Sequence, residues 1–241
     1  MGEIVRLDKF LTDMGVGTRS EVKAYIRKGR VQINGQVQKV PDIKINTNNT
    51  QVLFDNQLLQ YEEFVYYMLN KPAGVVSATI DNLSTTVVEL ITEANSKAIF
   101  PVGRLDKDTE GLLLLTNDGD LSHQLLSPKK HVEKVYYAKV KGYVTQDDVL
   151  LFKKGIKISD DFTTLPAKLN IIQSDEISEI ELTICEGKFH QVKRMFIAVG
   201  KEVIYLKRLR MANLRLDENL ASGEYRRLND EEIQSLKNMK N

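Results

Sequence analysis

Short apolar segments that predict buried β-strands recur along the chain from residue 64 onwards, with short helical segments between them. Each strand candidate is rich in β-branched or aromatic residues and is bounded by turn-forming residues. Because strands and helices do not alternate regularly, their order favours an α+β fold with a mixed, mainly antiparallel sheet over a doubly wound fold. The strand candidates are residues 64–69, 75–79, 112–116, 135–140, 168–173, 180–185 and 203–206, and the helix candidates are residues 85–94, 147–154, 190–199 and 231–237.

The first sixty residues have a separate pattern of two short helices followed by a hairpin. Apolar residues recur at helical spacing in residues 6–13, and Thr18 and Glu21 make a capping box that starts a second helix. Residues 31–37 alternate around an Asn-Gly pair, which is the strongest short signal for a β-hairpin. Polar turn residues follow, so the sequence predicts a small α/β domain at residues 1–60 and a larger domain at residues 61–241.

A basic face runs along the second predicted helix, where the spacing is four, four and three residues between Arg19, Lys23, Arg27 and Arg30. Residues 6–44 contain nine Lys and Arg against four acidic residues, and residues 186–227 contain ten against five. In an arbitrary protein such a stripe is a solvated helix face. In a chain of formal net charge +1, two local excesses favour two positive surfaces over a diffuse polyelectrolyte.

Composition excludes several classes of protein. Cys185 is the single cysteine, which rules out an intramolecular disulfide, and three histidines without ligand spacing argue against a zinc site. No apolar run approaches membrane-spanning length and the N-terminus lacks a signal-peptide core, so we expect a reduced, cytoplasmic protein. A phosphate loop, a dinucleotide fingerprint and an exposed heptad repeat are all missing, and we expect a monomer.

An acid-rich loop at residues 103–111 runs into four consecutive leucines, and three interpretations compete for its acids. Asp106, Asp108 and Glu110 match the first half of a calcium-binding loop, but the twelfth position holds Asn117 instead of Glu. The acids can also cap and solubilise a loop ahead of a core strand. In the third interpretation one Asp is catalytic, because a buried strand fixes a carboxylate that the loop keeps accessible.

Residues 103–119 are similar to the active-site motif of the RsuA-type RNA pseudouridine synthases. Residues 67–74, 134–136 and 186–195 are similar, in the same order, to the family's first, Lys-x-Tyr and third motifs. The two helices, basic face and hairpin at the N-terminus resemble the S4 RNA-binding domain that precedes these motifs in the family. The resemblance covers nearly the whole chain, and it implies an S4-like domain followed by a pseudouridine synthase domain.

The resemblance also implies an isomerase that breaks the uridine glycosidic bond, turns the base and rejoins it to the sugar through carbon, without a cofactor or metal. Asp106 holds the nucleophile position, where an ionised carboxylate captures or stabilises the electron-poor sugar carbon. Lys193 holds the position of the family's basic residue, which keeps that carboxylate ionised in a dry pocket. Tyr136 matches the active-site tyrosine, although a single tyrosine is more often a core residue.

Further residues are expected to bind the RNA. Arg104 matches the residue that fills the gap left by the departing base, and Arg194 is close enough in sequence to be confused with Lys193. The S4 resemblance turns the basic face into a set of phosphate contacts made by Arg19, Lys23, Arg27 and Arg30. His190 and Cys185 are interpreted as structural.

Residues 122–128 and 221–226 resemble more closely the branch that acts on small-subunit (16S) ribosomal RNA. This implies ribosomal RNA as the partner, in an assembly intermediate of the small subunit. Two alternatives stay open: a sibling that acts on large-subunit (23S) RNA, and a non-catalytic RNA-binding factor for ribosome assembly. The intact set of Asp106, Tyr136 and Lys193 argues against the second alternative.

Overall fold

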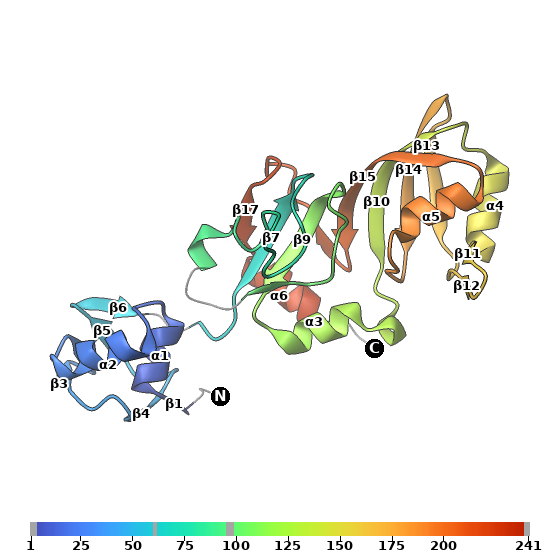
Figure 1. Ribbon diagram of the computed structural model, residues 1–241. Coiled ribbons are helices and arrows are strands. Elements are labelled where there is room, and N and C mark those ends of the chain that lie inside the picture. The colour runs from blue at the N-terminus through green and yellow to red at the C-terminus, as the bar shows by residue number, and fades with distance from the viewer. Residues whose placement is uncertain (1–3, 60–61, 95–98, 239–241) are drawn as a thin grey trace. The chain divides into compact units, whose positions relative to one another are not determined.

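The computed structural model describes residues 4–59, 62–94 and 99–238 (Figure 1). The chain divides into two compact units, one comprising Met1–Val65 and Ile91–Ile99 and the other Tyr66–Leu90 and Phe100–Asn241. The predicted domain boundary at residues 60 and 61 lies outside the described residues and stays a prediction. None of the helices in the described ranges has the length and apolar character needed to cross a bilayer.

The N-terminal unit packs two helices against short strands, as the sequence predicts. Its elements are β1 (Ile4–Arg6), α1 (Leu7–Asp13), α2 (Arg19–Arg27), β2 (Val31–Ile33), β3 (Gln36–Gln38), β4 (Lys44–Asn46), β5 (Val52–Phe54) and β6 (Gln57–Leu59). The four-stranded sheet has the order β3-β2-β5-β6, and β1 pairs with β4. The capping box of Thr18 and Glu21 is confirmed, and so is the hairpin, whose turn residues Asn34 and Gly35 have φ of 48° and 82°.

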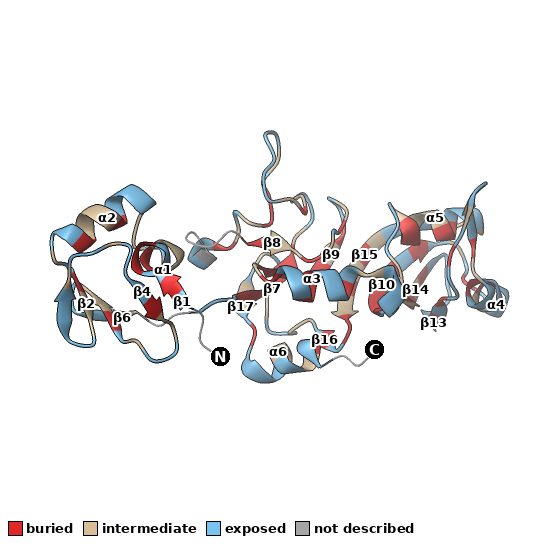
Figure 2. Cartoon of the chain, turned by 90° about the horizontal axis from the view of Figure 1, so that it is seen from below, coloured by how far each residue is buried: buried red, intermediate tan, exposed pale blue. Residues whose placement is uncertain are grey.

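The larger unit is built on a nine-stranded sheet, which confirms the α+β class. Its main path is β13 (Lys168–Gln173), β14 (Ile177–Ile184), β10 (Lys134–Lys141), β15 (Glu202–Met211), β9 (Glu110–Thr116), β7 (Tyr66–Lys71) and β17 (Tyr225–Arg227). The short strands β8 (Phe100–Pro101) and β16 (Leu214–Arg215) pair with β9 and β15. Every pairing is antiparallel except that of β9 with β15. Buried residues, red in Figure 2, run along β7 and β9.

Helices cover the two ends of this sheet differently. They are α3 (Gly119–Leu126), α4 (Gln146–Lys154), α5 (Gln191–Ala198) and α6 (Asp230–Lys237), with the 3-10 turns η1 (Thr92–Ala94) and η2 (Pro128–Lys130) and the small hairpin of β11 (Lys157–Ser159) and β12 (Phe162–Thr163). Side chains of α3 and α6 share an apolar core with β7 and β9. At the other end α5 packs on β15 and β11, and α4 packs on β13. As a result, α5 lies over the part of the sheet that contains β10 (Figure 1).

The parallel contact between β9 and β15 joins the two halves of the sheet through only two residue pairs, Lys207 with Glu110 and Arg208 with Gly111. Gly111 has φ of +96°, a conformation that residues with a side chain rarely adopt. A Cβ atom at this glycine would lie 2.3 Å from the carbonyl oxygen of Arg208. The two halves therefore approach each other as closely as they do because position 111 has no side chain.

Two expectations about local structure are wrong, and one helix was missed. Residues 85–94 form turns and η1 instead of a helix, and Thr86 makes an isolated bridge with Val76. That bridge is also all that remains of the strand expected at residues 75–79. Helix α3 was not expected, although Asp118 caps it by accepting a hydrogen bond from the Leu121 amide.

Candidate active site

The loop that carries the acids is fixed at both ends by buried contacts. Ser77 Oγ donates to the Leu105 carbonyl at 2.9 Å and accepts from the Leu105 amide at 3.1 Å. The Thr109 amide donates to the Asp106 carbonyl at 3.1 Å, which closes a turn around the acids. Asp106 follows the buried Leu105 directly and precedes β9, so its backbone is held while its side chain stays a quarter exposed.

Lys71, the last residue of β7, supports this loop from inside the protein. Its side chain is fully buried, and Nζ donates to the carbonyls of Pro72, Lys107 and Thr109 at 2.9, 3.2 and 2.8 Å. Burial lowers the pKa of Lys71 to about 8, against the opposing pull of the nearby loop carboxylates. Sequence reasoning missed this role, although a lysine at the end of a wholly buried strand was a usable signal.

An ion-pair cluster links the acid-rich loop to α5 and consists of Asp106, Asp108 and Lys193. Lys193 Nζ, on α5, lies 3.2 Å from Asp106 Oδ2 and 2.6 Å from Asp108 Oδ1. The hydrogen bond from Lys193 holds the pKa of Asp108 below its usual value. Burial opposes the charge of Lys193, but its hydrogen bonds to the two carboxylates outweigh burial and raise its pKa. The expected contact between Asp106 and Lys193 is present, and Asp108 shares the same ammonium.

Two adjoining hollows open beside Asp106. The inner hollow is lined by Tyr136 of β10, Thr109 and Leu206, and the outer hollow by Ser77, Leu126 and Phe189. Arg104, Asp106 and His190 line both hollows. Asp106 and Tyr136 therefore share the wall of one cavity, although they come from opposite halves of the sheet.

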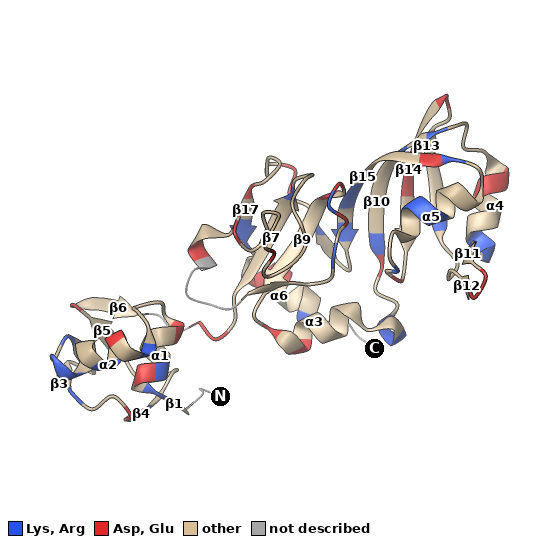
Figure 3. Cartoon of the chain, in the orientation of Figure 1, with Lys and Arg blue, Asp and Glu red and all other residues tan. Residues whose placement is uncertain are grey.

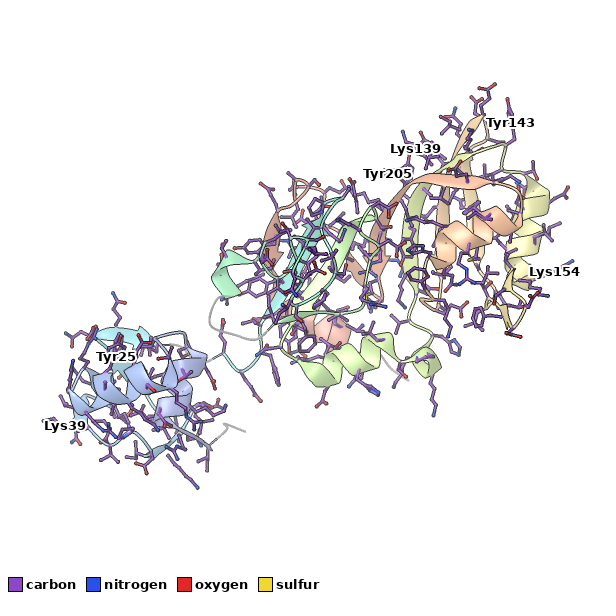
Figure 4. All side chains as sticks on the ribbon, viewed as in Figure 1. Tyr25, Lys39, Lys139, Tyr143, Lys154 and Tyr205 are labelled. Atoms are coloured by element: carbon purple, nitrogen blue, oxygen red, sulfur yellow. The ribbon has the colours of Figure 1, made fainter. Side chains whose placement is uncertain are left out.

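Tyr136 is only 7% exposed, and its side chain forms part of the inner hollow. Tyr137, the neighbour with which it can be confused, points elsewhere because successive residues of a strand face opposite sides. The ring of Tyr137 lies 6.0 Å from that of Tyr205, which is labelled in Figure 4. Burial, followed by a hydrogen bond to Glu179, raises the pKa of Tyr137 to about 12.

The two arginines predicted to bind RNA differ in their surroundings. Arg104 is exposed at the hollows, and its guanidinium has no ion pair with any residue in the described ranges. Arg194 instead donates from Nη2 to the carbonyl of Ile158 at 2.8 Å and from Nη1 to that of Phe189 at 3.4 Å. The Arg194 guanidinium is therefore bound to the backbone of two neighbouring segments, and this residue does not line either hollow.

His190 was interpreted as structural, but it lies at the site. Its Nε2 is 3.7 Å from Asp106 Oδ1, so Asp106 has nitrogen groups on two sides. His190 has φ of +49° and ψ of 32°, a left-handed conformation that few non-glycine residues adopt. The sequence signal was its place one residue after Phe189 at the start of a helix, inside the motif that also contains Lys193.

The basic face of the N-terminal unit is partly neutralised, as the mixed charges on α1 and α2 in Figure 3 indicate. Arg19 and Lys23 each approach to 3.9 Å from Asp8, a buried carboxylate. Arg30 donates from Nε and Nη2 to the two carboxylate oxygens of Asp55, and its guanidinium lies over the rings of Tyr25 and Phe54. Arg27 is exposed and has no ion pair within the described part of the chain.

Within the described residues, no group of three or more His, Cys, Asp or Glu side chains could hold a metal ion. In the loop with calcium-like spacing, Lys193 lies between Asp106 and Asp108, so its ammonium occupies the place next to both carboxylates. Cys185 is unpaired and half-buried, and burial raises the pKa of its thiol.

A mixed sheet with a carboxylate and a tyrosine lining one hollow agrees with the class expected from the motifs, the RNA pseudouridine synthases. The chain belongs to the RNA pseudouridylate synthase family, whose model matches residues 65–198, and an S4 domain matches residues 5–50. Members of this family are isomerases that act on RNA.

Particular relatives match over nearly the full length. An uncharacterized RNA pseudouridine synthase, YtzG, of Bacillus subtilis is 48% identical over 96% of this chain and 98% of its own length. Ribosomal small subunit pseudouridine synthase A of Yersinia pestis is 42% identical over 96% of this chain and 98% of its own. Ribosomal large subunit pseudouridine synthase B of Bacillus subtilis is 39% identical, with coverages of 96% and 95%. A crystal structure of a pseudouridylate synthase matches with a TM-score of 0.68 and 39% identity, covering 96% of this chain and 99% of that one.

Proposed function

We propose that this chain isomerises one specific uridine of small-subunit (16S) ribosomal RNA to pseudouridine, with Asp106 as the nucleophile. The observation that carries the proposal is the position of the Asp106 carboxylate, paired with Lys193 and lining the same hollow as Tyr136. The Lys193 ammonium lies 3.2 Å from Asp106 Oδ2 and holds this carboxylate at the hollow. A carboxylate is the form of the side chain that can attack carbon. Asp108 has the shorter contact with Lys193 but is 72% exposed and is not part of either hollow wall.

The reaction begins when the target nucleotide leaves its stack and its uracil enters the inner hollow. The Asp106 carboxylate captures or stabilises the sugar carbon as the bond from that carbon to the base nitrogen breaks. The freed base turns and a ring carbon bonds to the sugar, which releases the sugar carbon from Asp106. The proton that this ring carbon carried is lost, and the nitrogen that was bonded to the sugar gains one proton. Substrate and product have the same atoms, so the reaction is an isomerisation.

Tyr136 and Arg104 supply the surroundings of this step. The Tyr136 ring in the wall of the inner hollow is suited to stack beneath the uracil, and its hydroxyl is available for proton transfer. Arg104 has an exposed guanidinium at the mouth of both hollows, which suits the role of filling the gap left in the RNA. Lys193 positions Asp106 through its ion pair and does not line either hollow, so it does not contact the base.

The small-subunit target rests on two kinds of support. Residues 122–128 and 221–226 resemble the small-subunit branch, and several relatives named as small-subunit synthases are 39–42% identical to the chain. A large-subunit (23S) target is the second candidate, supported by the relative of that name at 39% identity. We further propose that the enzyme works as a cytoplasmic monomer, with residues 1–60 as an RNA-binding domain and Arg27 as its most available phosphate contact.

The nucleophile is tested with two matched variants, Asp106→Asn and Asp108→Asn. Each removes one negative charge from the cluster around Lys193 without changing side-chain shape. We expect Asp106→Asn to abolish tritium release from RNA labelled at uridine C5, and Asp108→Asn to retain most of it. RNA affinity, measured by filter binding, should stay within about twofold for both variants. If Asp106→Asn still releases tritium at the wild-type rate, the assignment of the nucleophile is wrong.

The target is tested by mapping pseudouridines in both ribosomal RNAs of a strain that lacks the gene. Loss of one site in 16S RNA, restored by the wild-type gene and not by the Asp106→Asn gene, is the expected result. Loss of a site in 23S RNA instead would replace the proposed target with the second candidate. A loss that the Asp106→Asn gene restores would indicate a non-catalytic assembly role.

A further inference from the structure

An exposed aromatic pair lies beside Asp106 and is not used by the chemistry described above. The rings of Phe189 and His190 are stacked, with centroids 3.7 Å apart and planes inclined by 19°. Phe189 is 71% exposed, so its outer face is open to solvent. Both side chains line the outer hollow together with Arg104, Asp106 and Lys188. We call Phe189 and His190 the aromatic platform.

The loop below the aromatic platform is held in place by several hydrogen bonds. The side chain of the buried Gln191 accepts from the Lys188 amide at 2.9 Å and donates to Glu186 Oε1 at 2.9 Å. Glu186 in turn accepts from the Leu165 amide at 2.8 Å. Arg194 donates to the Phe189 carbonyl at 3.4 Å. The exposed ring is therefore mounted on a preorganised turn, which reduces the entropy lost when a ligand stacks on it.

The backbone is also set for this arrangement. His190 has a left-handed conformation at the residue that starts α5, and its side chain does not cap the helix. Such a backbone conformation is unfavourable by about 1–3 kcal/mol in a non-glycine residue, and it persists where the surrounding contacts enforce it. Here it turns the imidazole towards Asp106, with Nε2 at 3.7 Å from Oδ1, and against the ring of Phe189. The aromatic platform and the catalytic carboxylate are thus connected through one residue.

We propose that the aromatic platform binds an unpaired nucleobase of the RNA, from a nucleotide next to the target uridine. This inference rests on the proposed role of Asp106 as the reacting group. Proteins that recognise single-stranded RNA stack splayed bases on Phe, Tyr, Trp and His rings. The outer hollow adjoins the inner one and shares Arg104 and Lys188 with it, so the phosphates on either side of such a base would meet positive charge.

Other roles of Phe189 fit the structure less well. A packing role would require burial, and this ring is largely exposed. A cation–π role within the protein would require a nearby ammonium, yet Lys188 lies over the ring of Phe162, at 5.0 Å from its centroid. A protein partner would compete with the RNA for the outer hollow, which Asp106 also lines. A base that flanks the target is, by contrast, covalently connected to the uridine and is brought close to the outer hollow when the uridine reaches Asp106.

The test combines protein variants with RNAs that lack single bases. Short RNAs carry the sequence around the uridine mapped in the gene-deletion strain, with tritium at C5 of that uridine. Each RNA of the series has a single abasic nucleotide, placed at one of the two positions before or the two positions after the uridine. The proteins are full-length wild type, Phe189→Ala, Phe189→Tyr and, as the matched control, Tyr143→Ala. Tyr143 is 57% exposed and follows β10, seven residues or roughly 20 Å of extended chain beyond Tyr136 (Figure 4).

With wild type we expect one abasic position to lower kcat/KM by about 5- to 150-fold, as the loss of one stacked base does. On intact RNA, Phe189→Ala should show a loss of the same size, mainly in KM, and should be insensitive to the abasic nucleotide at that position. Phe189→Tyr, which keeps a flat ring, should recover most of the kcat/KM lost in Phe189→Ala together with the sensitivity to that abasic nucleotide, and Tyr143→Ala should behave like wild type. Because Phe189 is exposed, replacing it by alanine leaves no cavity in the hydrophobic core, and we expect the fold to be unaffected.

Two results would overturn the proposal: unchanged kcat/KM of Phe189→Ala on intact RNA, or an abasic penalty that persists in full in this variant. An equal loss on all RNAs would indicate a structural role of Phe189 and would equally reject the aromatic platform. A different ribosomal RNA target only changes the sequence of the oligonucleotides. If Asp106 is not the nucleophile, Asp106→Asn still releases tritium. The effect of the abasic nucleotides on the wild-type enzyme does not change in that case.

Discussion

Gly111 sits where the two halves of the large sheet meet, and its replacement by alanine should destabilise the catalytic unit strongly. The added Cβ would lie 2.3 Å from the Arg208 carbonyl oxygen and 2.9 Å from the Arg208 amide nitrogen, both backbone atoms. Neither atom can move aside without separating β9 from β15, which share only two residue pairs. The conformation at φ +96° is itself unfavourable for alanine.

The size of the effect follows from these contributions. The backbone conformation costs alanine about 1–3 kcal/mol, and forcing an atom into a packed contact costs about 1–3 kcal/mol. Partial loss of ladder hydrogen bonds adds about 0.5–1.5 kcal/mol. We therefore expect Gly111→Ala to lower the free energy of unfolding by about 2.5–7.5 kcal/mol, a large part of the stability of a typical domain.

Urea unfolding followed by circular dichroism measures this change, with Gly119→Ala as the matched control. Gly119 begins α3, has no positive φ, and a Cβ there would meet no atom within 4 Å. Alanine at that position should leave the midpoint unchanged or raise the unfolding free energy by up to about 1 kcal/mol. If Gly111→Ala unfolds within about 1 kcal/mol of wild type, the close approach of β9 and β15 is not required for stability.

Two further predictions concern charge. In Lys193→Met the pKa of Asp108 should return towards its usual value, because the hydrogen bond that lowers it is lost. In wild type the ionised Asp108 contributes stability above about pH 4 that disappears as the pH falls through the lowered pKa. The gap between the urea midpoints of wild type and Lys193→Met should therefore narrow from pH 6 to pH 3, and a constant gap would contradict the assignment. Replacing Lys23 and Arg27 together by alanine should lower the dependence of log affinity on log salt by roughly 0.7–0.9 per lost phosphate contact. Arg30→Ala, which breaks the ion pair with Asp55, should lower stability and leave that salt slope unchanged. A lower salt slope in Arg30→Ala and an unchanged one in the Lys23 and Arg27 variant would instead make Arg30 the phosphate contact.

Elements with a clear local pattern could be predicted from the sequence. The strand expected at residues 168–173 is β13 with the same bounds, and the helix expected at residues 231–237 is α6, which begins with a capping box of Asn229 and Glu232. Local hydrogen bonds and hydrophobic periodicity decide such segments. The helix expected at residues 85–94 is absent because its β-branched start forms longer-range hydrogen bonds instead, with the Val76 amide donating to the Thr85 carbonyl.

The candidate site was predictable where a motif identifies a residue, and less so where contacts join distant segments. Asp106 and Lys193 were placed together because a family resemblance linked their motifs. The roles of Lys71 and His190 depend on which carbonyls and carboxylates surround them in the fold. Local sequence does not encode these neighbours. Arg194 was expected to bind RNA, but its guanidinium donates to two backbone carbonyls, one in β11 and one in the loop before α5.

The pairing of β7 with β17 also determines when the sheet of the larger unit can be completed during synthesis. β7 begins the catalytic unit and β17 lies near its end, with Tyr67 opposite Arg227 and the Asn70 amide donating to the Glu224 carbonyl. Until residue 227 has left the ribosome, β7 has an open edge, and the half of the sheet that holds Asp106 is incomplete. A nascent chain therefore already contains Asp106, Tyr136 and Lys193 while the edge of β7 is still open, and this edge is covered only when β17 pairs with β7.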